Sequence, residues 1–194
     1  MSINDWRLRP MSDVTRSPAR WRARRAEVLA RRRVPLGFLF GIVVLWLARP
    51  TMRSLMMGGL VALAGEAFRI WAAGHLEKGR EVTRSGPYRL TRHPLYMGSA
   101  VIGLGLAIAA ARLSAAALIG VYLATTMLAA IEHDEASMRV AFGHQYDAYL
   151  QSRAQAEDRP FSLARAMRNK EYRAIAGLAV VAAILAMKAA FGAQ

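Results

Sequence analysis

Five apolar, weakly charged runs divide the chain and predict five membrane-spanning helices. A helix needs about 20 apolar residues to cross the hydrocarbon core of a bilayer. The third and fourth runs, of 18 and 19 residues, fit this length best. The first and last runs are shorter, so they either cross with flanking Arg or Lys side chains reaching outward or lie partly in the interface. The expected fold is an all-α, polytopic transmembrane bundle of about five spans. The runs cover residues 34–48, 54–74, 94–111, 113–131 and 174–187.

Charge is distributed unevenly around these runs and predicts the orientation of the chain. The 194 residues include 27 Lys and Arg against 13 Asp and Glu, although 55% of the residues are hydrophobic. Of the basic residues, 22 fall in residues 1–33, 75–93 and 132–173, which share one side of a five-span bundle. The positive-inside rule places this side in the cytoplasm, at the inner membrane if the protein is bacterial.

The same composition excludes several classes of protein. Long apolar runs argue against a nucleic-acid-binding protein despite the positive charge. The absence of cysteine excludes disulfides, thiolate metal sites and a cysteine nucleophile. The lipid bilayer is therefore the partner that the composition predicts.

The chain divides into a basic N-terminal segment, residues 1–33, and a membrane domain, residues 34–194. Ser17-Pro18 is typical of a helix start, and Trp21, Val28 and Leu29 share one helical face. This pattern favours a cytoplasmic interfacial helix on anionic lipid. A disordered basic tail is the alternative.

A polar segment, residues 85–98, runs directly into the third apolar run. Gly86-Pro87 indicates a turn, and Pro94 stands where a helix can begin. Arg92 and His93 then lie at the N-terminal end of a membrane helix, where free N–H groups attract an anion such as a carboxylate. Tyr96 follows one turn later. The alternative is an interfacial belt of basic and aromatic residues.

A second polar segment, residues 132–149, follows the fourth run and is predicted to be helical. Met138, Phe142, Tyr146 and Tyr149 form a stripe that would press this helix against the membrane surface or the other polar loop. No metal site is expected, because neighbouring helical residues point in different directions. Glu135 and Arg139 could be a simple surface pair.

Two charged residues, Glu66 and Arg69, interrupt the second apolar run at a spacing of i,i+3. A charge inside a membrane is costly, so such residues mark a functional site by default. The alternative is that they pair with each other near the cytoplasmic edge.

The two polar segments together resemble the isoprenylcysteine carboxyl methyltransferase and phospholipid methyltransferase family of integral membrane enzymes. The family motif G-P-Y-x-x-x-R-H-P-x-Y-x-G is matched at residues 86–98, and E-E-x-x-L-x-x-x-F-G-x-x-Y-x-x-Y is matched at residues 134–149. Two positions depart from the second motif: Asp134 replaces a glutamate and Met138 a leucine. The likeness covers roughly residues 60–155.

This resemblance implies a methyltransferase that uses S-adenosyl-L-methionine and acts on a lipid-borne or small amphiphilic acceptor. Such an enzyme builds its cofactor pocket from a helix end and cytoplasmic loops, without a Rossmann domain. Arg92 and His93 are then candidates for the carboxylate of the cofactor, and Asp134 or Glu135 for its ammonium group.

The remaining roles follow from the same resemblance. Tyr88 or Tyr96 could face the sulfonium or the adenine, while Pro94 and Gly98 complete the cofactor-binding motif. Glu135 and Arg92 are the catalytic candidates, with Glu135 a general base if the acceptor is an amine or alcohol. The candidates for binding the acceptor head group are Glu66 and Arg69.

Three alternative functions are also consistent with these residues. They are a phospholipid amine N-methyltransferase, an NADPH-dependent membrane reductase of the sterol type, and a membrane scaffold without enzymatic activity. Neither the oligomeric state nor the choice between O- and N-methylation follows from the residues.

Overall fold

The computed structural model describes residues 37–151 and 158–192. The basic segment 1–33 and its expected interfacial helix lie outside the described residues. The described residues from Ile42 onward belong to one compact unit. This unit contains both polar segments that the sequence singles out.

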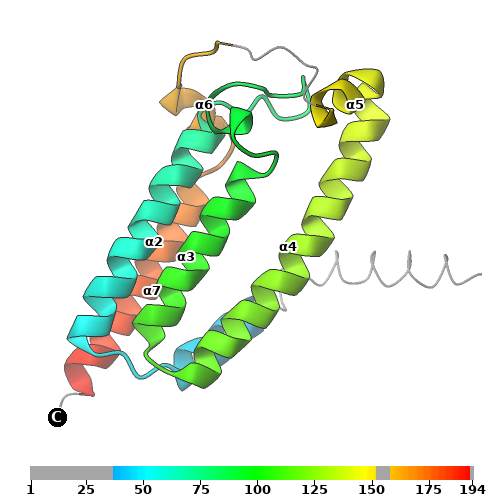
Figure 1. Cartoon of the computed structure of the whole chain (residues 1–194). Coiled ribbons are helices and arrows are strands. Elements are labelled where there is room, and N and C mark those ends of the chain that lie inside the picture. Colours follow the sequence, from blue (N-terminus) through cyan, green and yellow to red (C-terminus); the bar gives the residue numbers. More distant parts are fainter. Residues whose placement is uncertain (1–36, 152–157, 193–194) are drawn as a thin grey trace, which may run out of the picture. The chain divides into compact units, whose positions relative to one another are not determined.

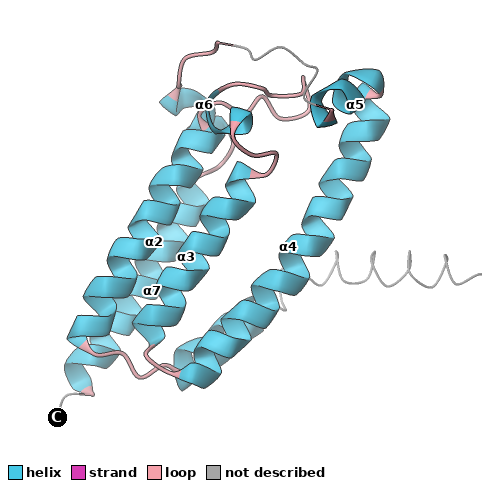
Figure 2. Cartoon of the chain, viewed as in Figure 1, coloured by secondary structure: helices cyan, strands magenta, loops and turns pink. Residues whose placement is uncertain are grey.

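In the described ranges every regular element is a helix, which confirms the expected all-α fold (Figure 1 and Figure 2). A short apolar helix, Gly37–Leu47, comes first. The elements that follow are α2 (Met52–Ala73), the 3-10 helix η2 (Gly86–Arg89), α3 (Pro94–Ala110), α4 (Leu113–Phe142), α5 (His144–Leu150), α6 (Leu163–Arg168) and α7 (Tyr172–Phe191).

Three of these helices, α2, α4 and α7, are long and apolar enough to cross a membrane. The last apolar run is extended at both ends, so α7 has 20 residues and reaches the length of a full span. Helix α3 has 17 residues, about 25 Å at 1.5 Å per residue. It is therefore shorter than a typical hydrocarbon core of about 30 Å. In the described part of the chain, the helical bundle therefore contains three candidate membrane spans and two shorter apolar helices.

Glycines bring α2 and α3 into close antiparallel contact. A Cβ atom added to Gly58 would collide with backbone atoms of Gly105 and Ala109, and one added to Gly65 would collide with the backbone of Gly98. Small residues at these positions let two helix backbones approach each other within a membrane, where dispersion contacts drive association. The close packing expected from the abundant glycines is therefore present between these two helices.

Helix α7 is held at its C-terminal end by a lysine. The Nζ of Lys188 donates hydrogen bonds to the carbonyl oxygens of Leu45, Trp46 and Ala48 at 2.7, 3.1 and 2.7 Å. These carbonyls lie at the end of the helix Gly37–Leu47, where backbone acceptors have no partner within the helix. The ammonium group supplies the missing donors and favours the negative end of the helix dipole.

Replacing one interfacial glycine is predicted to loosen the α2–α3 contact. Gly58→Ala should lower the free energy of unfolding by about 1 to 3 kcal/mol, because the new methyl group overpacks a backbone contact. Thermal unfolding of the detergent-solubilised protein measures this loss.

The neighbouring glycine provides a matched control. Gly59 has no atom within 4 Å of the position that its Cβ would occupy, so Gly59→Ala should cause no loss of stability. Equal unfolding temperatures for the two variants would contradict the proposed packing.

Candidate active site

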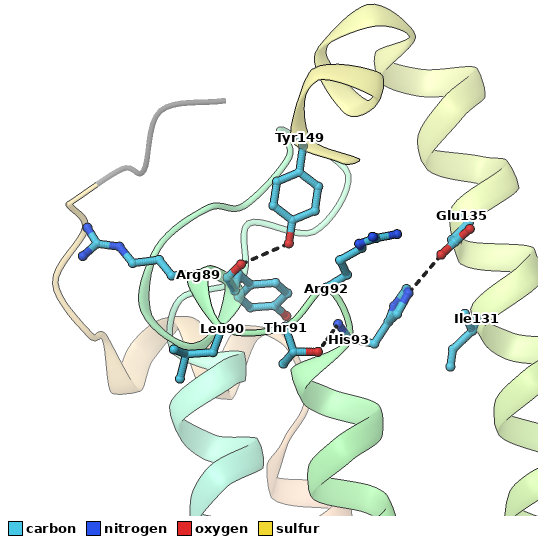
Figure 3. A pocket seen from close by; sticks show the side chains of 9 residues that line it. Arg89, Leu90, Thr91, Arg92, His93, Ile131, Glu135 and Tyr149 are labelled. Atoms are coloured by element: carbon cyan, nitrogen blue, oxygen red, sulfur yellow. Dashed lines mark hydrogen bonds and ion pairs between the residues drawn. The ribbon is translucent and has the colours of Figure 1, made fainter. Parts of the chain in front are cut away.

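A pocket of about 510 Å³ opens at one end of the bundle, beside the N-terminus of α3 (Figure 3). Its walls come from the loop that precedes α3, from the polar part of α4 and from α5. The lining residues are Tyr88, Arg89, Leu90, Thr91, Arg92, His93, Ile131, Glu135 and Tyr149.

The wall before α3 is a compact turn built by glycine and proline. Gly86 has a φ of 56°, a left-handed conformation that favours glycine. The carbonyl of Pro87 accepts hydrogen bonds from the N–H groups of Leu90 and Thr91 at 3.0 and 3.1 Å. Pro94 then occupies the first turn of α3 and is fully buried. The sequence prediction of a turn followed by a helix at Pro94 is confirmed.

The N-terminus of α3 carries no side-chain cap. His93 is the residue at the cap position, but its side chain makes no hydrogen bond to the first turn. Its imidazole instead points toward α4, and Arg92 is directed the same way (Figure 3). The first N–H groups of an α-helix have no partner within the helix, so this end of α3 attracts anions.

A hydrogen bond between His93 and Glu135 joins the two polar segments. The Nε2 of His93 lies 3.1 Å from Oε1 of Glu135, and each side chain is about a quarter exposed, at 23% and 24%. Arg139 lies 3.6 Å from the other carboxylate oxygen of Glu135. The surface pair considered for Glu135 and Arg139 therefore exists, but Glu135 also lines the pocket.

Tyr96 and Asp134 make a second link between the same helices. The Tyr96 hydroxyl donates to Oδ2 of Asp134 at 2.5 Å. Asp134 is exposed and is not among the lining residues. Of the two acidic candidates for binding an ammonium group, Glu135 is therefore the one that faces the pocket.

The predicted stripe of large side chains does not lie on one continuous helix. Helix α4 ends at Phe142, and Gly143 adopts φ 45° and ψ −119°, which breaks the helix before α5 begins. The prediction of one continuous helix was wrong because glycine readily leaves helical geometry, but the predicted contact of the stripe with the other polar loop is present. The break turns α5 back over the pocket, buries Tyr146 and brings the Tyr149 hydroxyl to the Tyr88 carbonyl at 3.0 Å.

The tyrosines around the pocket are held in their neutral form. Burial raises the pKa of Tyr88 well above that of an ordinary phenol, and the nearby Tyr149 and Glu171 raise it further. Burial also raises the pKa of Tyr146 and of Tyr149. These rings therefore offer neutral, electron-rich faces rather than phenolates at physiological pH.

The other predicted site residues have different surroundings. Gly98 packs against Gly65 and Arg69 at the α2–α3 contact rather than at the pocket. Glu66 and Arg69 also lie outside the lining set. Of the predicted site residues, the fold brings four together around the pocket: Tyr88, Arg92, His93 and Glu135. Pro94, Tyr96 and Asp134 lie next to them.

Arg69 connects three helices. Its Nε donates to Oε1 of Glu171 at 2.6 Å, and one of its terminal nitrogens donates to the Ser99 hydroxyl. Glu66 is more distant, 3.8 Å from Arg69 Nε. The expected internal pairing is present, but the shortest contact is with Glu171, at the start of α7, which no local sequence pattern indicates.

Five pocket residues were not predicted to be site residues. Two of them could have been predicted from the sequence, because Tyr149 belongs to the second family motif and Thr91 lies inside the first. Ile131 could not have been predicted, because nothing in the sequence distinguishes it from the other apolar residues of its run. The five are Arg89, Leu90, Thr91, Ile131 and Tyr149. In residues 37–151 and 158–192 no group of three His, Asp or Glu side chains could hold a metal.

Comparison with known proteins identifies the family. The family model described as Phospholipid methyltransferase matches residues 33–145, a range that contains α2, α3, α4 and most of the pocket lining. No curated protein and no solved structure matches the chain. The match covers more than half of the sequence and includes both His93 and Glu135. The chain belongs to the phospholipid methyltransferase family and is an integral membrane protein of the methyltransferase type.

Proposed function

We propose that this protein transfers a methyl group from S-adenosyl-L-methionine to a lipid-borne or small amphiphilic acceptor. The observation that supports this proposal most is the 3.1 Å contact between His93 and Glu135. That contact sets both family motifs around one pocket, where Arg92 and Glu135 supply groups of opposite charge. Methyl donor and acceptor would meet where this pocket adjoins the membrane helices.

The chemistry of the lining residues fits the methyl donor. S-Adenosyl-L-methionine carries a carboxylate, an ammonium group, a sulfonium and an adenine ring. The pocket offers the guanidinium group of Arg92, one carboxylate and two phenol rings, while the guanidinium of Arg89 points away toward Asp158 (Figure 3). Its volume of about 510 Å³ falls in the usual range of about 300 to 1,000 Å³ for small-molecule sites. Each charged part of the donor thus has a complementary group.

The roles of the residues follow from their positions. Arg92 and the uncapped N-terminus of α3 would hold the carboxylate, with His93 beside them. Glu135 would accept hydrogen bonds from the ammonium group. Tyr88 and Tyr149 present neutral rings that suit the sulfonium or the adenine.

Bound in this pocket, the donor would supply an electrophilic methyl group for in-line displacement. The protein residues would then contribute mainly orientation and exclusion of water. A carboxylate acceptor needs no proton removed. An amine or alcohol acceptor must lose a proton, and Glu135 is the pocket carboxylate that could take it.

The predicted head-group role of Glu66 and Arg69 has weaker support than the donor site. Arg69 already donates to Glu171 and Ser99, and neither Glu66 nor Arg69 lines the pocket. These contacts favour a role in joining helices within the membrane.

Loss of either partner of the His93–Glu135 pair is predicted to weaken donor binding. Each partner makes a charged hydrogen bond in the proposed site, so His93→Ala or Glu135→Ala should weaken binding by about 10- to 100-fold. Calorimetry with S-adenosylhomocysteine on the purified protein measures the affinity, which we expect to be micromolar in the native chain.

Matched control residues lie on α4, the helix that carries Glu135. His133 and Glu132 are exposed and outside the pocket, so His133→Ala and Glu132→Ala should bind S-adenosylhomocysteine as the native protein does. Undiminished binding by both pocket variants would refute the site. Binding of NADPH without binding of S-adenosylhomocysteine would instead favour the reductase alternative.

The class of acceptor can be identified directly. Membranes containing the protein should transfer label from methyl-labelled S-adenosyl-L-methionine to a lipid, and the Glu135→Ala variant should not. Identification of the labelled lipid distinguishes a carboxyl acceptor from a phospholipid amine. Label in no lipid or small amphiphile would contradict the proposed activity.

The pocket is predicted to face the cytoplasm. The chain has no cysteine, so the exposed Arg80 and Arg112 can each be replaced by a single reporter thiol. Because the basic loop before α3 obeys the positive-inside rule, a membrane-impermeant maleimide should label Arg80→Cys only in inverted vesicles. The same reagent should label Arg112→Cys in intact cells, and the reverse pattern would overturn the orientation.

A further inference from the structure

A buried histidine lies directly behind the turn that forms the pocket wall. His75 is 5% exposed, and its ring rests against Gly86. A Cβ atom on Gly86 would come within 2.7 Å of three atoms of this ring. The positive φ of Gly86 and the imidazole behind it thus both require glycine at the first position of η2.

The His75 ring is fixed on several sides. Its Nδ1 lies 2.9 Å from the carbonyl oxygen of Trp71, so Nδ1 carries the proton and donates to that carbonyl. The Trp71 ring stands edge-on to the imidazole, with centroids 6.2 Å apart, and the Phe161 ring lies on it at 6.1 Å. A ring held in this way gives Gly86 a rigid backing.

Phe161 begins a segment, residues 161–169, that we call the C-terminal clasp. The clasp contacts the C-terminal end of α2, where backbone carbonyls lack helical partners. Arg165 Nη1 donates to the Gly74 carbonyl at 2.5 Å, and Asn169 Nδ2 donates to the carbonyls of Ala73 and Leu76, both at 2.9 Å. The clasp therefore caps the helix end from which His75 projects.

A salt bridge strengthens the same junction. Arg165 Nε donates to Oε1 of Glu77 at 2.8 Å, and this hydrogen bond is the main reason that the pKa of Glu77 is lowered. The clasp thus contacts residues 73–77 through directional polar interactions as well as apolar ones. They hold the chain on both sides of His75.

We propose that the C-terminal clasp acts through His75 to hold Gly86 and the following turn in the conformation that binds the methyl donor. The route is a sequence of direct contacts: Phe161 on His75, His75 on Gly86, and Gly86 at the start of the turn that carries Tyr88. His75 is then a positioning residue. This inference rests on the proposed donor site, and it extends the requirements of that site to residues beyond the family match at 33–145.

The inference is tested by measuring the affinity for S-adenosylhomocysteine in three variants of the full chain. His75→Ala and Phe161→Ala should each weaken binding by about tenfold, because the turn loses its preorganisation. Phe161→Tyr should bind as the native protein does, since Phe161 is 47% exposed and the added hydroxyl can reach solvent while the ring contact is kept.

The double variant shows whether Phe161 acts through His75. If it does, His75→Ala combined with Phe161→Ala should bind no more weakly than His75→Ala alone, because contacts in series are not additive. Additive losses, or native affinity in both single variants, would overturn the proposal. Absence of binding in the native protein would instead refute the proposed function itself.

A control separates positioning from general loss of stability. Lys188→Met removes the three hydrogen bonds at the opposite end of α7 and should lower the unfolding temperature without changing the affinity for S-adenosylhomocysteine. If Lys188→Met weakens binding as much as Phe161→Ala at an equal loss of unfolding temperature, the clasp has only a structural role and the inference is wrong.

Discussion

The backbone contact between α2 and α3 is the constraint on which the rest of the structure depends. Lipid tails are as apolar as leucine side chains, so helices in a bilayer gain little from burying apolar surface and must gain from close packing. The glycine pairs Gly58 with Gly105 and Gly65 with Gly98 provide that packing at two levels of the bundle. They fix how far α3 extends along α2, and so determine where His93 meets α4.

Polar contacts then determine how the other elements join this pair. Helix α4 approaches α3 at Gly103, where a Cβ would meet Leu123, and again through His93–Glu135 and Tyr96–Asp134. The second set of contacts lies where the chain leaves the apolar part of the bundle. Because charged and hydroxyl groups are costly within lipid but strongly directional, they specify a unique arrangement at the end of the bundle that carries the pocket.

Local patterns in the sequence predicted the helices well, and family resemblance predicted the pairing of the two motifs. Pro94 marks a helix start by its fixed φ and missing N–H, and an apolar run gives the approximate length of each span. No local pattern revealed that Glu171 would be the main partner of Arg69, because 102 residues separate them. The break at Gly143 was also missed, since glycine allows a helix to end without requiring it.

The contacts of α7 determine its register in the membrane. Glu171 bonds to Arg69 just before the helix begins, and Lys188 bonds to three carbonyls near its end. Both anchors are polar and point in fixed directions, whereas most of the side chains between them are exposed on the surface of the protein. Axial sliding of α7 is therefore blocked by two charges, and its intervening residues can drift among apolar types during evolution while the helix keeps its depth.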